Sequence, residues 1–468
     1  MNLFKLLKPA PHIAEISDSK KVDTEYKYWR IRIFYSMFIG YALYHFTRKS
    51  FTFAMPGLIE DLHFDKSELG ILGSVLAITY GISKFTSGIM SDQSNPRYLM
   101  GFGLMLTGVF NIFFGFSSSL LAFALFWGLN GWVQGFGWAP CSRFLTQWYS
   151  HGERGGWWSF FNVSHNVGAF IIPWIVGMCL HYWGWRSAMC LPGVIAILGG
   201  FFLINRLRDT PQSLGLPNVE KYRNDYTGAQ SLDEDKDKNL KTRDLLAIVL
   251  RNRLIWLLGI AYFFIYVLRI GIPDWAALYL IEAKGYGRLS AIGCVSLFEV
   301  GGFVGNLAAG WASDRLFGAR RGPVNALCAI GALCVIPILW FAPPGQSWVD
   351  SCALFLFGFT IFGPQMLIGM AAAELYHKRA AATANGFVGT FAYMGAAFAG
   401  YPFGVIMDTW GWEGFFWALL ACASLATAIL IPLWGLSDRK SASTEISSIP
   451  IPVPVPVVVK NSSSVEAN

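Results

Sequence analysis

Two arginines lie inside stretches that are otherwise apolar enough to cross a membrane. Arg48 is part of IGYALYHFTRKSFTFAMP, and Arg269 is part of GIAYFFIYVLRIGIPDWAALYLI, 221 residues further along the chain. An arginine at the centre of a membrane-spanning helix costs roughly 2.5 to 3.5 kcal/mol on insertion scales, so such a residue faces a partner or a water-filled cavity. Two cations in corresponding places predict an anionic ligand between them.

Tyrosines accompany both arginines at helical spacing. Tyr41 and Tyr44 precede the first arginine by seven and four positions and share its helical face, and Tyr266 precedes the second by three. Their hydroxyls could serve ligand oxygens, or they could bond to backbone inside a helix interface. We expect Tyr41 and Tyr266 in the binding site, and Tyr44 and Tyr262 in packing.

Other charged side chains in the spans could complete such a site or hold it together. Lys84 and Tyr80, one turn before it, form a second polar patch, and both are expected in the binding site. Lys84 is a candidate third ligand for the anion or an ion-pair partner. Lys49 follows the first arginine directly but points about 100° away around the helix, so an ion pair, with Glu299 for example, is as plausible as ligand contact. Asp274 and Glu299 are expected to pair with cations of the site while it is empty.

One histidine, His165, lies deep in an apolar run and is flanked by Asn166. An imidazole titrates near neutral pH, so a bound anion nearby could hold it charged. A neutral histidine bonded between helices is the alternative. We expect ligand contact.

The composition is that of a polytopic membrane protein. Of the 468 residues, 54% are hydrophobic and only 14% are charged, and the mean hydropathy is +0.44. In soluble domains about a quarter of all residues are charged. Twelve apolar runs have the length of about 20 residues that crosses a bilayer as a helix. They lie near 30–56, 68–90, 98–116, 119–147, 157–181, 187–206, 253–281, 289–312, 322–342, 349–373, 381–406 and 413–436.

Basic residues mark one side of the membrane. Lysine and arginine near span ends stay on the cytoplasmic side, and here they gather in alternate short loops, whereas 60–68 is largely acidic and 117–120 is uncharged. Both termini and the long middle loop are therefore expected in the cytoplasm, in a multi-pass protein of a bacterial-type inner membrane. This bias explains the net charge of +7, which gives no reason to expect a nucleic-acid partner.

Short sequence patterns of the first half recur in the second half, and the number of residues between the two copies grows slowly along the chain. A duplication of one half produces such a pattern. Asp92 and Asp314 are 222 residues apart, and the Trp-Gly-Trp of 183–185 returns at 410–412. We expect an all-α fold of two pseudo-symmetric six-helix halves. The expected segments are a cytoplasmic N-terminus at 1–29, the halves at 30–206 and 253–436, a charged cytoplasmic linker at 207–252, and a disordered proline-rich cytoplasmic tail at 437–468.

The element Gly-x-x-Ser-Asp follows the second span of each half, in GIMSDQSNPR at 88–97 and GWASDRLFGARR at 310–321. It resembles the loop signature of the major facilitator superfamily. Within that superfamily the chain is similar to the organophosphate:phosphate antiporter family, chiefly to its hexose-phosphate branch of transporters and a related membrane sensor. The strings that carry this resemblance are GYALYHFTRKSF, ITYGISKF, ERGGWW, SHNVGAF, RDTPQSLGLP, YVLRIGI, FGPQMLIGMAAAEL and TFAYMG.

The resemblance implies a secondary transporter and not an enzyme. It would import a sugar phosphate, expected to be glucose 6-phosphate, in exchange for inorganic phosphate by alternating access. The alternative is a sensor of external hexose phosphate that signals to a membrane kinase partner. The sequence lacks P-loop, metal-ligand and nucleophile signatures, so no cofactor or metal is expected. The expected partners of a transporter are the lipid bilayer, the sugar phosphate and inorganic phosphate, and the protein is expected to be a monomer.

The family also implies roles for individual residues. Arg48 and Arg269 would bind the phosphate, because a guanidinium fork matches two phosphate oxygens. Lys84 and His165 correspond to ligand residues of the family. Asp92, Asp314, Arg97 and Arg315 would instead latch the loops in the outward-open state, the alternative being solvated turns.

Some positions depart from the relatives. His45 and Phe362 stand where glycerol-phosphate relatives have site tyrosines, which argues against glycerol 3-phosphate. His45 could contact a sugar hydroxyl or pack between helices. Asn385 and Val388 replace an aspartate and a lysine of the hexose-phosphate transporters, so the sugar remains open.

Overall fold

The computed structural model describes residues 7–225, 249–318, 320–375 and 378–435, and within these ranges the chain is helical, without strands. The expected tail at 437–468 and the middle of the linker lie outside the described residues. The helices of the first half are α2 (Ser19–Leu62), α3 (Lys66–Gln93), α4 (Pro96–Phe116), α5 (Leu120–Trp148), α6 (His151–Trp183) and α7 (Trp185–Arg206). Those of the second half are α11 (Arg253–Glu282), α12 (Arg288–Arg315), α13 (Arg321–Phe341), α14 (Ser347–Glu374), α15 (Lys378–Phe398) and α16 (Tyr401–Leu430).

Short elements follow α7 and α16. The turn η1 (Pro211–Leu214) and the helix α8 (Val219–Arg223) follow the first half, and the turn η2 (Pro432–Gly435) follows the second. Nine stretches of the described chain are long and apolar enough to span a bilayer. α2 and α5 are not among them, and both carry polar side chains inside, such as Arg48 and Gln134. The expected twelve passes of an all-α fold are confirmed.

The eleventh and twelfth membrane passes both include part of one helix, α16. Gly411 interrupts α16 with φ 62° and ψ −162°, a conformation that glycine adopts without steric cost. The residues before Gly411 continue the pass that α15 begins, and the residues after it form the final pass. The eleventh span is therefore built from two helical pieces joined near Gly400.

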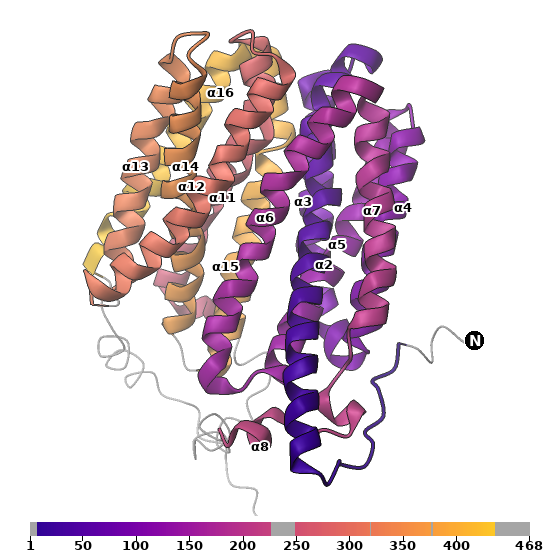
Figure 1. Cartoon of the computed structure of the whole chain (residues 1–468). Helices are drawn as coiled ribbons and strands as arrows, with labels where there is room; N and C mark the ends of the chain where they lie inside the picture. Colours follow the sequence, from indigo (N-terminus) through magenta and orange to yellow (C-terminus); the bar gives the residue numbers. More distant parts are fainter. Residues whose placement is uncertain (1–6, 226–248, 319, 376–377, 436–468) are drawn as a thin grey trace, which may run out of the picture.

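The two halves repeat one packing plan. In the first half α2 packs on α6 and α7, α3 on α5, and α4 on α5 and α7; in the second, α11 packs on α15 and α16, α12 on α14, and α13 on α14 and α16. Figure 1 shows the two bundles side by side. Between them, α3 contacts α15 and α16, while α12 contacts α6.

Glycines let the helices inside a half approach closely. A Cβ at Gly200 of α7 would lie 2.7 Å from the carbonyl oxygen of Gly101 in α4, and a Cβ at Gly193 would lie 2.7 Å from that of Gly108. Close backbone contact of this kind replaces the hydrophobic effect as the source of helix association within lipid. The glycine-rich composition thus serves the packing of α4 on α7.

Polar contacts between the halves gather at one end of the bundle. We call this the far end, since the described N-terminus lies at the opposite end, the terminal end, which is at the bottom of Figure 1. Arg288 of α12 pairs with Glu60 of α2, and Lys66 pairs with Glu282 at 2.9 Å. Asp408 accepts hydrogen bonds from the backbone N–H groups of Lys66 (3.2 Å) and Ser67 (2.8 Å) at the start of α3.

The same closure continues toward the middle of the bundle. Ser74 Oγ donates to the carbonyl of Ala397 at 2.6 Å, and Lys84 Nζ donates to the Tyr393 hydroxyl at 3.2 Å. Among the described residues, the hydrogen bonds and ion pairs that join the halves lie between the far end and Lys84. The far end is closed in this structure.

Candidate anion-binding site between the halves

Arg48 of α2 is held by a neutral side chain. Its Nε and Nη2 donate to Gln134 Oε1 of α5 at 3.3 and 3.1 Å. Gln134 is oriented in turn, because its Nε2 donates to Thr47 Oγ1 at 3.0 Å. The guanidinium lies 4.2 Å from the ring centroid of Tyr80 on α3, a cation–π distance. Arg48 therefore keeps its full positive charge beside an aromatic surface.

Arg269 of α11 has one neutral and one acidic partner. Its Nε donates to Gln365 Oε1 of α14 at 2.9 Å, and its Nη2 lies 3.5 Å from Glu299 Oε1. The guanidinium also stacks on Phe362, 4.1 Å from the ring centroid. Arg269 Nη1 and Glu299 Oε2 are buried without a hydrogen-bond partner among the described residues. This pair is buried and incompletely bonded, so it can be exchanged for a better partner.

Lys84 projects from α3 toward the second half. Its Nζ bonds to Tyr393 of α15 and lies 5.6 Å from the ring centroid of Trp138. Tyr80 meets the same tyrosine edge to face at 5.2 Å between centroids. Lys84, Arg48 and Tyr80 thus form one cluster around Tyr393.

The two histidines are neighbours within the first half. Their ring centroids, on His45 of α2 and His165 of α6, are 5.7 Å apart, and Tyr41 is 5.3 Å from His45. His165 lies parallel to Phe362 of the second half at 6.4 Å. The histidines thus link the surroundings of Arg48 to those of Arg269.

The other tyrosines fall into two groups, according to whether their hydroxyl groups bond to backbone carbonyls. Tyr44 donates to the carbonyl of Met100 at 2.8 Å, and Tyr262 donates to that of Gln365 at 2.7 Å, so both pack between helices. Tyr266 lies between Tyr262 and Tyr393, at 4.8 and 6.1 Å between ring centroids. Its position borders the cluster around Lys84.

An ion pair crosses the halves beside the site. Lys49 Nζ lies 2.5 Å from Asp274 Oδ1, which also accepts a hydrogen bond from Thr52 Oγ1 at 3.2 Å. The sequence suggested Glu299 as a partner of Lys49, and it also allowed Asp274 and Glu299 to pair with Arg269, Lys49 or Lys84. Glu299 instead faces Arg269, and the carbonyl of Glu299 accepts a hydrogen bond from Asn166 of α6 at 3.3 Å.

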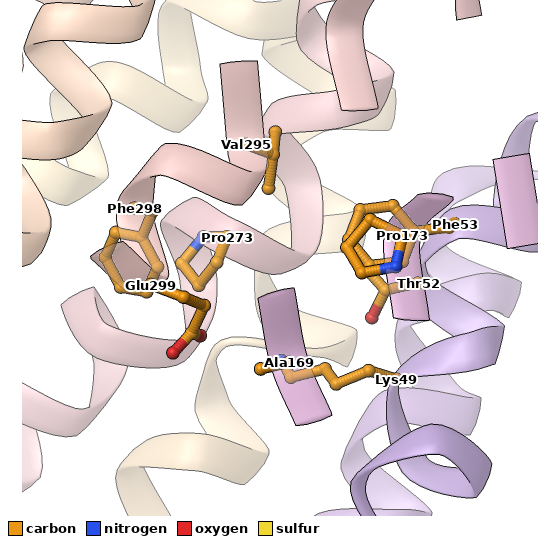
Figure 2. Close-up of a pocket in the computed structure, with 9 residues that line it drawn as sticks. All are labelled: Lys49, Thr52, Phe53, Ala169, Pro173, Pro273, Val295, Phe298 and Glu299. Carbon is orange, nitrogen blue, oxygen red and sulfur yellow. The ribbon is translucent and has the colours of Figure 1, made fainter. Parts of the chain in front are cut away.

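A narrow pocket lies at this crossing, between α2 and α6 on one side and α11 and α12 on the other. Figure 2 shows Lys49 and Glu299 entering it from opposite halves. Two helix prolines, Pro173 of α6 and Pro273 of α11, line it as well. A proline inside a helix frees a carbonyl and favours a bend, so the wall of the pocket is built where two helices can change direction. The lining residues are Lys49, Thr52, Phe53, Ala169, Pro173, Pro273, Val295, Phe298 and Glu299.

The charges between the halves do not cancel. Asp274 neutralises Lys49, and Glu299 is the acidic neighbour of Arg269. Arg48 and Lys84 bond to an amide and a phenol, and neither pairs with a carboxylate among the described residues. Two positive charges are therefore left over, from two helices of the same half. This excess matches a doubly charged anion.

The loop residues assigned as latches take other partners. Asp314 pairs with Arg321 at 2.6 Å, not with Arg315 or Arg320. Arg97 donates from Nε to the carbonyl of Ile204 at 2.5 Å, because the start of α4 lies against the end of α7. The side chain of Asp92 lies outside the described residues. Asp314 therefore pairs within its own half in this conformation, and the latch role of the outward-open state stays a prediction.

Sequence reasoning missed several residues of the site. Gln134 and Gln365 orient the arginines, and Trp138 and Tyr393 surround Lys84. A signal existed, because each glutamine is an amide in an apolar span near Pro140 or Pro364. In the part of the chain that the structure describes, no group of three or more His, Cys, Asp or Glu side chains could hold a metal ion.

Comparison with known proteins identifies the family. The sequence model of the Major Facilitator Superfamily matches residues 37–400. The chain belongs to the major facilitator superfamily. It is thus a multi-pass membrane protein of a transporter family and not an enzyme. The solved structure of a bacterial homolog to the human lysosomal transporter Spinster, inward-facing and unoccupied, matches with a TM-score of 0.68 over 91% of this chain and 99% of that chain; at 16% identity it shows the fold alone.

Closer relatives place the chain in the organophosphate:phosphate antiporter family of this superfamily. The chain is 56% identical over 453 residues to the "Probable hexose phosphate transport protein" of Chlamydia pneumoniae, covering 95% of this chain and 100% of the relative. It is 45% identical over 431 residues to the "Membrane sensor protein UhpC" of Escherichia coli (strain K12), covering 92% of this chain and 98% of that relative. This chain is thus similar over nearly its whole length both to a protein named as a transporter and to one named as a sensor.

Proposed function

We propose that this protein imports a sugar phosphate, glucose 6-phosphate, in exchange for inorganic phosphate by alternating access. The observation that carries the proposal is the excess of two positive charges, on Arg48 and Lys84, beside the partly bonded Arg269. A phosphomonoester is mostly a dianion near neutral pH, because its second pKa is about 6. The relative named as a hexose phosphate transport protein supports the sugar.

The phosphate would take its place between the two halves. The guanidinium of Arg48 remains available beyond its bonds to Gln134, and Lys84 adds a point charge from the neighbouring helix. On the opposite half, a phosphate oxygen would replace Glu299 at Arg269 and bond to the free Nη1. The phosphate group therefore draws the halves together around itself.

This replacement of Glu299 supplies a reason for exchange. Without ligand, unbalanced cations would have to pass from one side of the membrane to the other, and buried unpaired charges are costly. With either phosphate or a sugar phosphate bound, the charges are balanced and the halves can rock. Reorientation of the empty protein should be slow, so import of one anion requires export of another.

The proposed orientation puts both termini and the terminal end in the cytoplasm of a bacterial-type inner membrane. The basic loops at that end support this orientation. With the far end closed, the conformation described here would then be open toward the cytoplasm. Inorganic phosphate would enter the site from this side.

A sensor of external hexose phosphate is the second candidate. The 45% identity to a membrane sensor protein favours it, and Asn385 and Val388 depart from the pattern of the transporters. A sensor would bind the same ligand through the same arginines but pass the conformational change to a kinase partner. Binding without exchange distinguishes the two.

The deciding experiment measures exchange in proteoliposomes loaded with radiolabelled phosphate. We expect external glucose 6-phosphate to release the label quickly, and Arg48→Lys or Arg269→Lys to slow release about 30-fold or more, because lysine lacks the bidentate fork. Arg223→Lys, at an exposed arginine paired with Glu153, serves as the control and should leave release unchanged.

Other outcomes would reject parts of the proposal. Tight binding of glucose 6-phosphate without release of the label would favour the sensor. Release at a similar rate without external anion would contradict obligate exchange. Unchanged release in both arginine variants would overturn the site.

A further inference from the structure

A second group of arginines lies outside the site, at the terminal end of the first half. Arg32 of α2, Arg97 of α4 and Arg208, which follows α7, converge on the last carbonyls of α7. Arg97 Nε donates to Ile204 O at 2.5 Å, Arg208 Nη1 donates to Asn205 O at 2.9 Å, and Arg32 Nη2 donates to Asn205 O at 3.4 Å. We call Arg32, Arg97 and Arg208 the arginine cluster.

The arginine cluster carries more charge than the helix end needs. The C-terminus of a helix is equivalent to roughly half a negative charge, whereas three guanidiniums meet it here. Burial, together with the charges of Arg97 and Arg32, lowers the pKa of the Arg208 guanidinium. The three cations are therefore close enough to repel one another, and an anion from outside would relieve that repulsion.

The neighbouring carboxylates are occupied elsewhere. Asp209 is next in sequence to Arg208, but it is 1% exposed, pairs with Arg143 at 3.0 Å and accepts a hydrogen bond from the Ala10 N–H at 2.9 Å. Glu25 accepts a hydrogen bond from Trp29 Nε1 at 3.0 Å. Among the described residues, the hydrogen-bond acceptors of the cluster are backbone carbonyls and the hydroxyl of Tyr28.

The surroundings of the cluster belong at the membrane interface. The ring of Trp29 lies 4.8 Å from the Arg32 guanidinium and 4.9 Å from that of Arg208. Tryptophan is enriched at the depth of lipid headgroups. Large apolar side chains next to the cluster are exposed, with Ile31 63% and Phe201 62% accessible. An anion bound here would therefore have acyl chains beside it.

We propose that the arginine cluster is a binding site for the phosphodiester headgroup of an anionic phospholipid. Guanidiniums are weakly hydrated and match phosphate oxygens in pairs, and basic pockets between membrane helices on the cytoplasmic side bind such headgroups. The apolar rim favours a lipid over a free phosphate. The proposal is independent of the transported substrate and rests only on the proposed orientation of the terminal end.

The test measures lipid association directly. Purified full-length protein is placed in phosphatidylcholine membranes with a trace of spin-labelled phosphatidylglycerol, and the immobilised fraction gives its association relative to labelled phosphatidylcholine. We expect Arg32→Gln and Arg208→Gln each to weaken the preference for phosphatidylglycerol about fivefold, the size expected for one interfacial cation. Arg208→Lys keeps the charge but lacks the paired donors, so its preference should lie between those of wild type and Arg208→Gln. Arg223→Gln removes a charge at the same end, from a paired arginine, and should leave it unchanged.

The controls separate this site from its alternatives. Retained helicity and thermal midpoint of each variant would show that lost preference is not unfolding, and phosphate exchange reports the other site separately. If Arg223→Gln weakened the preference as much as Arg208→Gln does, the effect would be diffuse surface charge and the proposal would be wrong. If millimolar inorganic phosphate displaced the labelled lipid, the cluster would be a site for soluble anions and not for lipid.

Discussion

The two site arginines differ in what they must give up to bind an anion. Arg48 is held by Gln134, whose bonds leave its charge unbalanced, whereas Arg269 shares its charge with Glu299. In the proposed site, Arg48 would therefore be ready for an anion before the anion arrives. Arg269 would have to exchange one partner for another, so ligand affinity would depend on how firmly Glu299 holds it.

The first prediction concerns Gln134. Gln134→Leu removes a hydrogen bond to a charged group, worth about 1.5 to 3 kcal/mol, and should weaken phosphate binding about tenfold or more. Gln134→Glu should weaken it further, because the carboxylate would neutralise Arg48. Phosphate:phosphate exchange as a function of concentration measures both. Gln346→Glu, at an exposed position, is the control; equal affinity in Gln134→Glu and wild type would contradict the charge argument.

The second prediction concerns the ion pair between Lys49 and Asp274, whose side chains are 15% and 22% exposed. Removing one partner leaves the other charge partly buried, which costs more than removing both. Lys49→Met and Asp274→Leu should each lower the thermal midpoint in detergent, and the double variant should recover part of the loss. Additive losses in the double variant would mean that the two charges do not stabilise one another.

At this scale the sequence identified cations and aromatic residues but not their partners. Arg48 and Arg269 stood out because a charge within an apolar span is costly. Lys49 pairs with Asp274 and not with Glu299 because of how α2 is rotated relative to α11 and α12. The periodicity of apolar residues in the sequence does not define that rotation. The role of Gln134 also depends on contacts between helices, so local patterns could not reveal it.

At the scale of the elements, closure of the far end depends on a close approach of two backbones. A Cβ on Gly70 of α3 would lie 2.6 Å from the carbonyl oxygen of Gly400, whereas one on Gly73 would lie 3.7 Å from the Gly400 Cα. The break between α15 and α16 therefore fits against α3 only because position 70 has no side chain. The same break places Ser74 within reach of Ala397 and Tyr401.

A third prediction follows from this contact. Gly70→Ala should disfavour closure of the far end, and Gly73→Ala, one turn along the same helix, should be tolerated. Spin labels at Leu121 and Trp348, exposed positions near the far end in opposite halves, report the opening as a longer distance in pulsed EPR, in a background without the native cysteines. The same distance distribution in both variants would rule out this role for Gly70.

Asp408 gives the fourth prediction. It caps the start of α3 from the opposite half, and a helix cap contributes about 0.5 to 2 kcal/mol. Asp408→Ala removes both acceptor oxygens and should therefore shift the balance toward an open far end by about two- to thirtyfold, seen with the same spin labels. Asp18→Ala, at a cap of α2 within one half, should not change the distances, and a shift in that control would point to a general loss of stability.

The elements themselves were largely predictable. Apolar length gave the number of spans, because lipid requires every backbone group to bond inside its own helix. Helix ends were less predictable: α2 begins at Ser19, well before the apolar run at 30–56, since a helix continues into water when a cap such as Asp18 is available. The break near Gly400 was not predicted, although Gly400 and Pro402 are a local signal for one.

For the whole molecule, the duplicated pattern of the sequence predicted two similar halves, and the repeated packing plan confirms them. The conformation was not predictable, because the contacts inside each half do not define how the two halves lie against each other. Arg288, Lys66 and Asp408 close the far end through contacts with the opposite half. These contacts join residues that are far apart in the chain, so local sequence patterns do not predict them.

In the proposed exchange and orientation, the uncompensated charges of Arg48 and Lys84 would also make the protein respond to voltage. Each elementary charge that crosses the full field gains or loses about 2.3 kcal/mol per 100 mV. A cytoplasm that is electrically negative would attract the unloaded cations and hold the empty protein open inward. When a dianion cancels the two charges, that force disappears, so an exchange of one dianion for another carries no net current.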